Sequence, residues 1–237
     1  MTRKMLGMTN DGADLIPVPY AFGDKADWET RISHLLDNYC GKDGDPQCCS
    51  SALTSGAHFL HGELSIRIRY HHALKEAFRF VPGENRQWGW HSLIDTPLLR
   101  LGLISLHGVF SIPLHDHPKA HGVLKVLSGQ VRIRQYQFAP NTDLGNNLVS
   151  LEQVSDSVLA KGKSSAFTPS IRNLHELGSL SSRSVLLSMM VNPYKPYERS
   201  WYYQVPFTQS GNTGLYNRIR RRPPISSTTS TNVRKIA

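Results

Sequence analysis

The stretch that most constrains the fold runs over residues 111–136, SIPLHDHPKAHGVLKVLSGQVRIRQY. An extended apolar run leads into His115 and His117, which are separated only by Asp116. On a β-strand, residues two apart point to the same face, so we expect the two histidines to project together while Asp116 turns away. Neutral imidazole binds iron, copper, nickel and zinc alike. This stretch therefore predicts half of a metal site on a strand.

Short β-rich segments continue through the C-terminal half of the chain. Turn residues separate them, and many short strands at close spacing indicate a sandwich or barrel. The dipeptide at 128–129, Ser-Gly, predicts a tight hairpin between two of these segments. In QVRIRQY the residues alternate, which places Val131, Ile133 and Gln135 on one face and Arg132, Arg134 and Tyr136 on the other. The segments are PLLRLGLISL, GVFSIPLH, GVLKVL, QVRIRQYQF, SSAFTP and SVLLSMMVN.

Three regions differ in their composition. Residues 1–96 are expected to form a helical and irregular extension, with one helix ending near residue 40 and another over about 71–80. Residues 97–207 hold the β-rich core. Residues 208–237 are basic and rich in Ser and Thr, and we expect them to form a disordered tail.

Length and composition describe an ordinary globular protein of 237 residues, 39% of them hydrophobic. No run approaches the roughly 18 consecutive apolar residues that a membrane helix needs, and the N-terminus lacks the apolar core of a signal peptide. The odd number of cysteines, without such a signal, favours free thiols over a disulfide framework. These observations predict a cytoplasmic protein without a membrane partner. The cysteines are Cys40, Cys48 and Cys49.

The formal net charge of +9 raises the possibility of nucleic-acid binding. Much of the excess, however, lies in the predicted tail, which more often makes a chain soluble than binds a specific polyanion. Specific nucleic-acid binding is therefore not expected. The sequence leaves the oligomeric state open. The basic residues at this end are Arg218, Arg220, Arg221, Arg222, Arg234 and Lys235.

A third histidine, His175, lies between two of the predicted strands. In an antiparallel barrel, neighbouring hairpins can bring His175 against His115 and His117. Three imidazoles leave a divalent metal with open coordination positions, as a catalytic site requires. Taken alone, His175 is also compatible with a structural role.

Four blocks of sequence together resemble the thiol dioxygenases of the cysteamine dioxygenase and plant cysteine oxidase group. The resemblance covers roughly residues 101–204 and implies a single cupin barrel (double-stranded β-helix, jelly-roll) holding non-haem Fe(II). It matches His115, His117 and His175 to the iron ligands. It also matches Tyr202 to a tyrosine near the iron, which is expected to donate a hydrogen bond to oxygen or substrate. The blocks are IPLHDHP, HGVLKVLSGQVRI, LHELG and NPYKPYERSWYY.

The chain departs from this family at several positions around the expected site. Lys119 stands where members commonly have Gly, and Ser188 where they have an Asp on the strand after the third ligand. Ser200 replaces a cysteine that can cross-link to the tyrosine, so that cross-link cannot form. His121 stands near the glutamate position of the usual cupin motif; it could compete as a ligand, although a second-shell or structural role is favoured. The ligand set is thus complete while the substrate pocket is altered.

The resemblance implies a dioxygenase that adds both atoms of O2 to a thiol to give a sulfinic acid. The substrate would be a small aminothiol or the N-terminal Cys of a peptide. A neutral three-histidine site leaves the metal its full positive charge, which favours an incoming thiolate. Two alternatives stay open: a diverged cupin oxygenase acting on a non-aminothiol, and a metal-binding cupin without turnover that acts as a sensor or interaction module. Imidazole ligands alone also suit nickel, copper or zinc.

Overall fold

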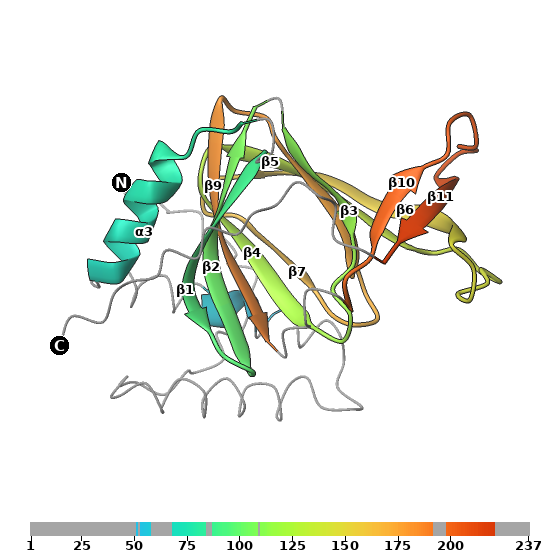
Figure 1. The fold of residues 1–237 in the computed structure, drawn as a ribbon, viewed down its shortest axis with the longest axis horizontal. Coiled ribbons are helices and arrows are strands. Elements are labelled where there is room, and N and C mark those ends of the chain that lie inside the picture. Colours follow the sequence, from blue (N-terminus) through green and yellow to red (C-terminus); the bar gives the residue numbers. More distant parts are fainter. Residues whose placement is uncertain are drawn as a thin grey trace, which may run out of the picture.

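The structure is a computed structural model that describes residues 51, 53–57, 68–83, 87–108, 110–191 and 198–220. The predicted helix ending near residue 40 and the three cysteines lie outside these residues. The described part of the chain is mainly β, with strands in two antiparallel systems that pack together (Figure 1). This confirms the predicted mainly β fold with a barrel.

The first system is a five-stranded sheet, and the second closes on itself as a six-stranded barrel. The sheet has the order β1 (Trp88–Asp95), β2 (Leu99–His107), β9 (Arg183–Val191), β4 (His121–Ser128), β7 (Ser164–Phe167). The barrel has the order β10 (Trp201–Gln204), β11 (Thr213–Ile219), β6 (Leu148–Ala160), β5 (Gln130–Phe138), β8 (Leu174–Ser179), β3 (Ser111–His115).

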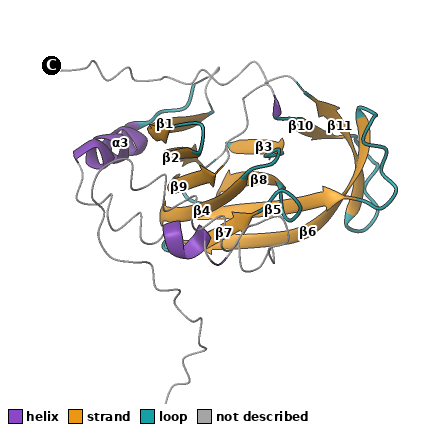
Figure 2. Cartoon of the chain, turned by 90° about the horizontal axis from the view of Figure 1, so that it is seen from below, coloured by secondary structure: helices purple, strands orange, loops and turns teal. Residues whose placement is uncertain are grey.

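Helix α3 (Ile68–Arg79) covers the outer face of the five-stranded sheet and lies beside β1 and β2 (Figure 2). Tyr70, Ala73 and Ala77 lie on one face of the helix at helical spacing, and all three are buried in one apolar cluster with residues of β2 and β9. The helix ends shortly before Pro82, which cannot continue it. It confirms the helix predicted over about 71–80.

A second apolar cluster fills the space between the sheet and the barrel. The predicted alternation in β5 is confirmed, because Val131, Ile133 and Gln135 are 0%, 1% and 2% exposed on this inner face. The intervening arginines, Arg132 and Arg134, form ion pairs on the opposite face. One face of β5 therefore packs in the apolar cluster, and the other carries ion pairs.

The prediction of a hairpin at Ser128 and Gly129 is wrong. β4 pairs with β7 and β9, whereas β5 pairs with β6 and β8, so the chain passes here from the sheet to the barrel. Gly129 has a φ of 78°, and a Cβ atom there would lie 2.5 Å from the carbonyl oxygen of Arg183. Glycine is needed because the corner is tight and crosses the start of β9.

The strands extend beyond the predicted core on both sides. β1 lies before residue 97 and pairs with β2, while β11 lies after residue 207 and pairs with β6 and β10. Among the described residues, no helix has the length and apolar character needed to cross a membrane.

Candidate metal centre

Three histidines meet where β3 and β8 run side by side. His115 ends β3 and lies directly opposite His175 of β8, and His117 follows in the turn after β3. The side chains are 3%, 1% and 5% exposed, respectively, and one ring nitrogen of each lies within 4.8 Å of the others. The structure thus brings together the three residues that the sequence singled out as ligands.

The arrangement of ring nitrogens fits a divalent metal. Nδ1 of His115 lies 2.7 Å from the carbonyl oxygen of Pro113 and donates to it, which leaves the Nε2 lone pair for a metal. Nε2 of His117 and Nε2 of His175 are 3.1 Å apart. Two imidazoles bound at right angles with metal–nitrogen distances of about 2.1 Å would be about 3.0 Å apart. Little movement is therefore needed for both nitrogens to share one ion.

Burial keeps the three imidazoles neutral. Desolvation is the largest cause that lowers the pKa of each ring, and the positive charge of Arg199 lowers all three further. The pKa of His175 falls to about 3. Only a neutral imidazole offers a lone pair to a metal, so the site holds its ligands in the required protonation state.

Aromatic rings fix the orientation of two of the histidines. Phe167 at the end of β7 stacks on His117, with ring centroids 4.4 Å apart. Trp201 of β10 lies beside His115 at 5.2 Å. Both aromatic side chains are buried, at 3% and 1% exposure, so neither ring has room to reorient.

Asp116 ties the turn between the two histidines to the next strand of the barrel. Its Oδ1 accepts a hydrogen bond from the backbone N–H of Ser200 at 2.7 Å, and its Oδ2 accepts one from the hydroxyl of Tyr202 at 2.9 Å. The backbone N–H of Asp116 in turn donates to the carbonyl of Ser200. Burial raises the pKa of Asp116, while these hydrogen bonds favour its charged form.

Tyr202 and Ser200 therefore contact Asp116. On β10, Trp201 faces His115, whereas the ring of Tyr202 packs in the apolar cluster on the opposite face. The hydrogen bond that the sequence assigns to oxygen or substrate goes to Asp116 in this structure. A catalytic contact of Tyr202 with substrate stays a prediction.

The remaining predicted residues lie on the five-stranded sheet. Ser188 of β9 is 5% exposed and alternates with Leu187, which faces α3, so its side chain points toward the barrel. His121 begins β4 and shares the face of Val123, which also belongs to the cluster beneath α3. Among the described residues, the group of possible metal ligands consists of His115, His117 and His175 and does not include His121.

Sequence reasoning missed the supporting residues Asn173 and Phe167. Asn173 is 8% exposed and its side chain bonds to the backbone of His117. A buried Asn two residues before a candidate ligand is a usable signal, because a buried amide needs partners. No pattern in the sequence identified Phe167 as the ring that stacks on a ligand.

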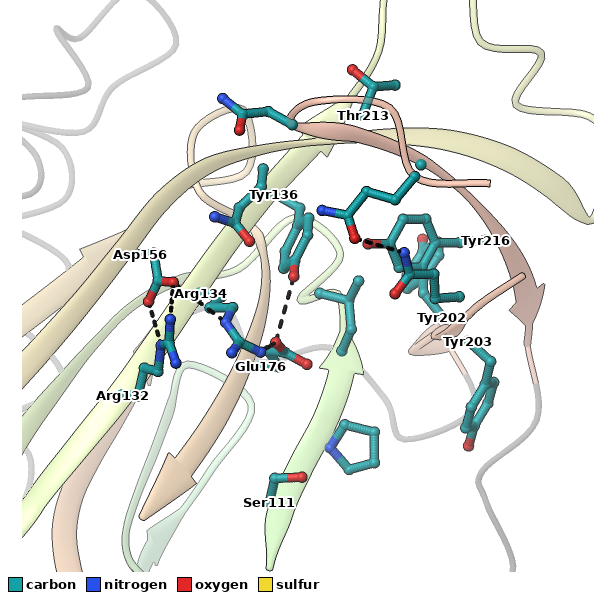
Figure 3. Close-up of a pocket in the computed structure, with 17 residues that line it drawn as sticks. Ser111, Arg132, Arg134, Tyr136, Asp156, Glu176, Tyr202, Tyr203, Thr213 and Tyr216 are labelled. Carbon is teal, nitrogen blue, oxygen red and sulfur yellow. Dashed lines mark hydrogen bonds and ion pairs between the residues drawn. The ribbon is translucent and has the colours of Figure 1, made fainter. Parts of the chain in front are cut away.

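A cavity of about 590 Å³ is lined by residues from all six strands of the barrel, which Figure 3 shows as sticks. None of the three histidines lines it. Tyr136, Tyr202 and Tyr216 line part of it. Its charged groups pair with one another: Arg132 with Asp156, and Arg134 with Glu176. Glu176 lines the cavity while its neighbour His175 belongs to the histidine cluster, so β8 separates the cavity from the cluster.

The fold and the site define a mainly β protein with a cluster of three buried histidines that could hold a metal ion, and comparison with known proteins gives its family. The chain belongs to the PCO_ADO family, whose model matches residues 75–230. It is 30% identical over 135 residues to a 2-aminoethanethiol dioxygenase of Mus musculus, covering 48% of this chain and 52% of the relative. The corresponding protein of Homo sapiens is 30% identical over 125 residues, covering 44% and 46%. The chain thus spans about half the length of the curated relatives it matches.

Comparison with solved structures finds proteins that are more distant in sequence. A Klebsiella pneumoniae protein with a double-stranded β-helix domain has a TM-score of 0.37 and 14% identity, covering 49% of this chain and 87% of that one. A cupin superfamily protein of Desulfitobacterium hafniense has a TM-score of 0.34 and 14% identity, with coverage of 48% and 85%.

Proposed function

We propose that this protein is an Fe(II)-dependent thiol dioxygenase whose metal ligands are His115, His117 and His175. The observation that carries the proposal is the cluster of three buried, neutral imidazoles with nitrogens within 4.8 Å of one another, in a chain of the PCO_ADO family. The relatives named 2-aminoethanethiol dioxygenase support oxygen chemistry on a thiol.

The reaction is the addition of O2 to a thiol. Both oxygen atoms pass to sulfur and the product is a sulfinic acid, so four electrons leave sulfur, O2 accepts them, and no further reductant is required. His115, His117 and His175 would hold the ferrous iron, which when bound would supply Lewis-acid chemistry that lowers the pKa of a thiol and redox chemistry toward O2.

The chain's own residues keep this site in order. The imidazoles stay neutral because they are buried. Phe167 and Trp201 hold the rings of His117 and His115 and keep water away from them. Holding two reactants close together in a dry site is the main contribution a protein can make to such chemistry.

Ser188, Ser200 and His121 belong to the surroundings of the site in this proposal. Ser188 points into the space between sheet and barrel and forms part of the substrate pocket. Ser200 supports Asp116 through its backbone N–H. His121, which shares the face of Val123, has a structural role beneath the sheet.

The substrate is a small thiol or the N-terminal Cys of a peptide, and the activity is cytoplasmic, where thiols stay reduced. Ser188 favours a diverged pocket, because a serine cannot neutralise a substrate ammonium group as an aspartate can. Two alternatives remain: a diverged oxygenase that acts on a non-aminothiol, and a metal-binding protein without turnover. The following experiment separates them from the proposed dioxygenase.

The test combines metal analysis and turnover on one sample. The purified protein is loaded anaerobically with Fe(II), mixed with cysteamine, cysteine, 3-mercaptopropionate or a Cys-initiated peptide, and exposed to air. A mass gain of two oxygen atoms on one thiol, absent without iron, supports the dioxygenase. Stoichiometric iron with no thiol oxidised contradicts it and favours a diverged oxygenase that acts on another substrate, or, where no oxygen is consumed with any candidate, a metal-binding protein without turnover. Retention of zinc or nickel in place of iron contradicts the metal assignment.

A further inference from the structure

Two buried N–H donors without acceptors flank the histidine cluster. They are Nε1 of Trp201 and Nε2 of Gln135, whose side chains are 1% and 2% exposed. Within the part of the chain that the structure describes, neither nitrogen has a hydrogen-bond partner. Buried polar groups in folded proteins are almost always paired, so each of these donors calls for an explanation.

Both residues lie directly opposite a candidate ligand. Trp201 pairs with His115 between β10 and β3, and Gln135 pairs with His175 between β5 and β8. Side chains that face each other across antiparallel strands project to the same side, with Cβ atoms about 5 Å apart. The two donors therefore belong to the same interior space as the metal centre.

The position of Gln135 makes an apolar residue the expected choice. Val131 and Ile133 precede it on the same face of β5, and both are fully buried. A buried amide that lacks a hydrogen-bond partner lowers the stability of the fold. A chain that keeps a glutamine here accepts that cost, which suits a group that meets an acceptor only when a ligand is bound.

The charge around the cluster favours an anionic acceptor. The half-buried guanidinium of Arg199 lies 5.4 Å from the centre of the Trp201 ring, and its charge is felt by all three histidines. The carboxylate of Asp116 is directed toward Ser200 and Tyr202. Ser188 brings no negative charge from the facing sheet.

We propose that Trp201 Nε1 and Gln135 Nε2 donate hydrogen bonds to the carboxylate of the substrate, and that the substrate class is therefore a carboxylate-bearing thiol. This inference rests on the proposed function and specifies the substrate of the same site. Both residues are specificity-determining residues, because they contact the part of the substrate that does not react.

A matched pair of thiols tests the inference. 3-Mercaptopropionate and cysteamine share the same thiol and two-carbon spacer, and they differ in carrying a carboxylate or an ammonium group. Their dissociation constants are measured by calorimetry on the iron-loaded protein without oxygen. Because hydrogen bonds to a charged group contribute about 1.5–3 kcal/mol, we expect 3-mercaptopropionate to bind at least about tenfold more tightly than cysteamine.

Two variants locate the effect. Trp201→Phe keeps a ring beside His115 but removes the N–H, and Gln135→Met keeps the side-chain length but removes the amide. Each should weaken 3-mercaptopropionate about tenfold and change cysteamine binding less than about twofold. Gln137→Met is the matched control, because Gln137 is exposed on the same strand and bonds to Glu152.

Stability gives a readout that does not depend on metal or turnover. Urea unfolding of metal-free Gln135→Met should show a midpoint at or above that of the wild-type protein, because the lost amide has no partner. A large decrease would show that the amide is structural and would overturn its assignment as a substrate contact.

The outcomes separate this inference from the function on which it rests. Equal weakening of both thiols in the variants, or tighter binding of cysteamine by the wild-type protein, overturns the inference even where thiols are oxidised. Selective binding of 3-mercaptopropionate that depends on Trp201 and Gln135, without oxidation in air, supports the inference and contradicts the dioxygenase.

Discussion

The side-chain amide of Asn173 holds both backbone polar groups of His117. Its Oδ1 accepts from the His117 N–H at 2.8 Å, and its Nδ2 donates to the His117 carbonyl, also at 2.8 Å. His117 lies beyond the end of β3, where no strand ladder positions the backbone. The amide therefore makes the hydrogen bonds to His117 that a neighbouring strand would otherwise make, at the one candidate ligand that lies in a turn.

Replacing Asn173 should damage both the fold and the metal site. In Asn173→Ala the buried N–H of His117 loses its partner, whereas the His117 carbonyl keeps the backbone N–H of Ala120 at 3.1 Å. We expect the free energy of unfolding to fall by about 1–3 kcal/mol. Metal affinity should fall about 10- to 100-fold, as it does when groups that orient ligands are removed. Urea denaturation and cobalt titration measure the two effects. Asn146→Ala, which removes an exposed amide that bonds to Asp143, serves as the control. Unchanged cobalt affinity in a folded Asn173→Ala protein would contradict the positioning role.

The hydrogen bond from Tyr202 to Asp116 gives a second prediction. Tyr202→Phe removes a donor to a half-buried carboxylate, which should lower stability by about 1–3 kcal/mol and weaken cobalt binding because the turn that holds His115 and His117 loosens. Tyr203→Phe, on the same strand and 39% exposed, should change neither quantity. Normal cobalt affinity in Tyr202→Phe together with a lowered kcat would instead place Tyr202 in contact with substrate.

Gly122 makes room for the ring that stacks on His117. A Cβ atom at this position would overlap the ring of Phe167, so Gly122→Ala must displace Phe167 and disturb the ligand beneath it. Overpacking of this kind costs about 1–3 kcal/mol. Thermal unfolding and cobalt affinity should both show the damage. The control is Gly178→Ala in β8, where the nearest atom to an added Cβ lies 4.0 Å away. Equal effects at the two glycines would rule out the steric explanation.

Local patterns predicted the residues that cluster better than they predicted the pairing of the strands. Alternation along β5 is a short-range feature and appears in the structure as expected. His115 and His117 do come together, but His117 lies in the turn after β3 and not on the strand that the sequence predicted. The pairing partners of β4 and β5 are set by distant strands, which is why Ser128 and Gly129 suggested a hairpin that does not form. The orientation of β10 is likewise set by distant strands. The sequence places Trp201, Tyr202 and Tyr203 next to one another, but the pairing of β10 with β3 decides that Trp201 is the ring beside His115.

Lys119 adopts a φ of 60°, in the left-handed region that favours glycine. The side chain is exposed, so the strain has no compensating burial. Lys119→Gly should leave stability unchanged or raise it by up to about 1 kcal/mol, whereas Lys119→Val should lower it by about 1–2 kcal/mol. Chemical denaturation of the two variants checks this. The control Lys161→Gly, at an exposed turn residue without positive φ, should be destabilising. Destabilisation by Lys119→Gly would show that the lysine side chain contributes more than its backbone costs.

The pH dependence of stability follows from the burial of His175. Its pKa is about 3 in the folded protein, against 6.5 for an unperturbed histidine. The unfolded chain therefore takes up the proton first as the pH falls, and the metal-free protein loses stability below about pH 6.5, by up to about 1.4 kcal/mol per pH unit for this histidine. The pKa of Asp116 is raised by burial, so that group acts in the opposite direction and makes the dependence of stability on pH shallower at the acid end.

Urea midpoints between pH 7 and pH 5 should decline in the wild-type protein and in a variant of the exposed His71, His71→Gln. The decline should be smaller in His175→Gln, and an identical slope in that variant would show that His175 is not buried in its neutral form.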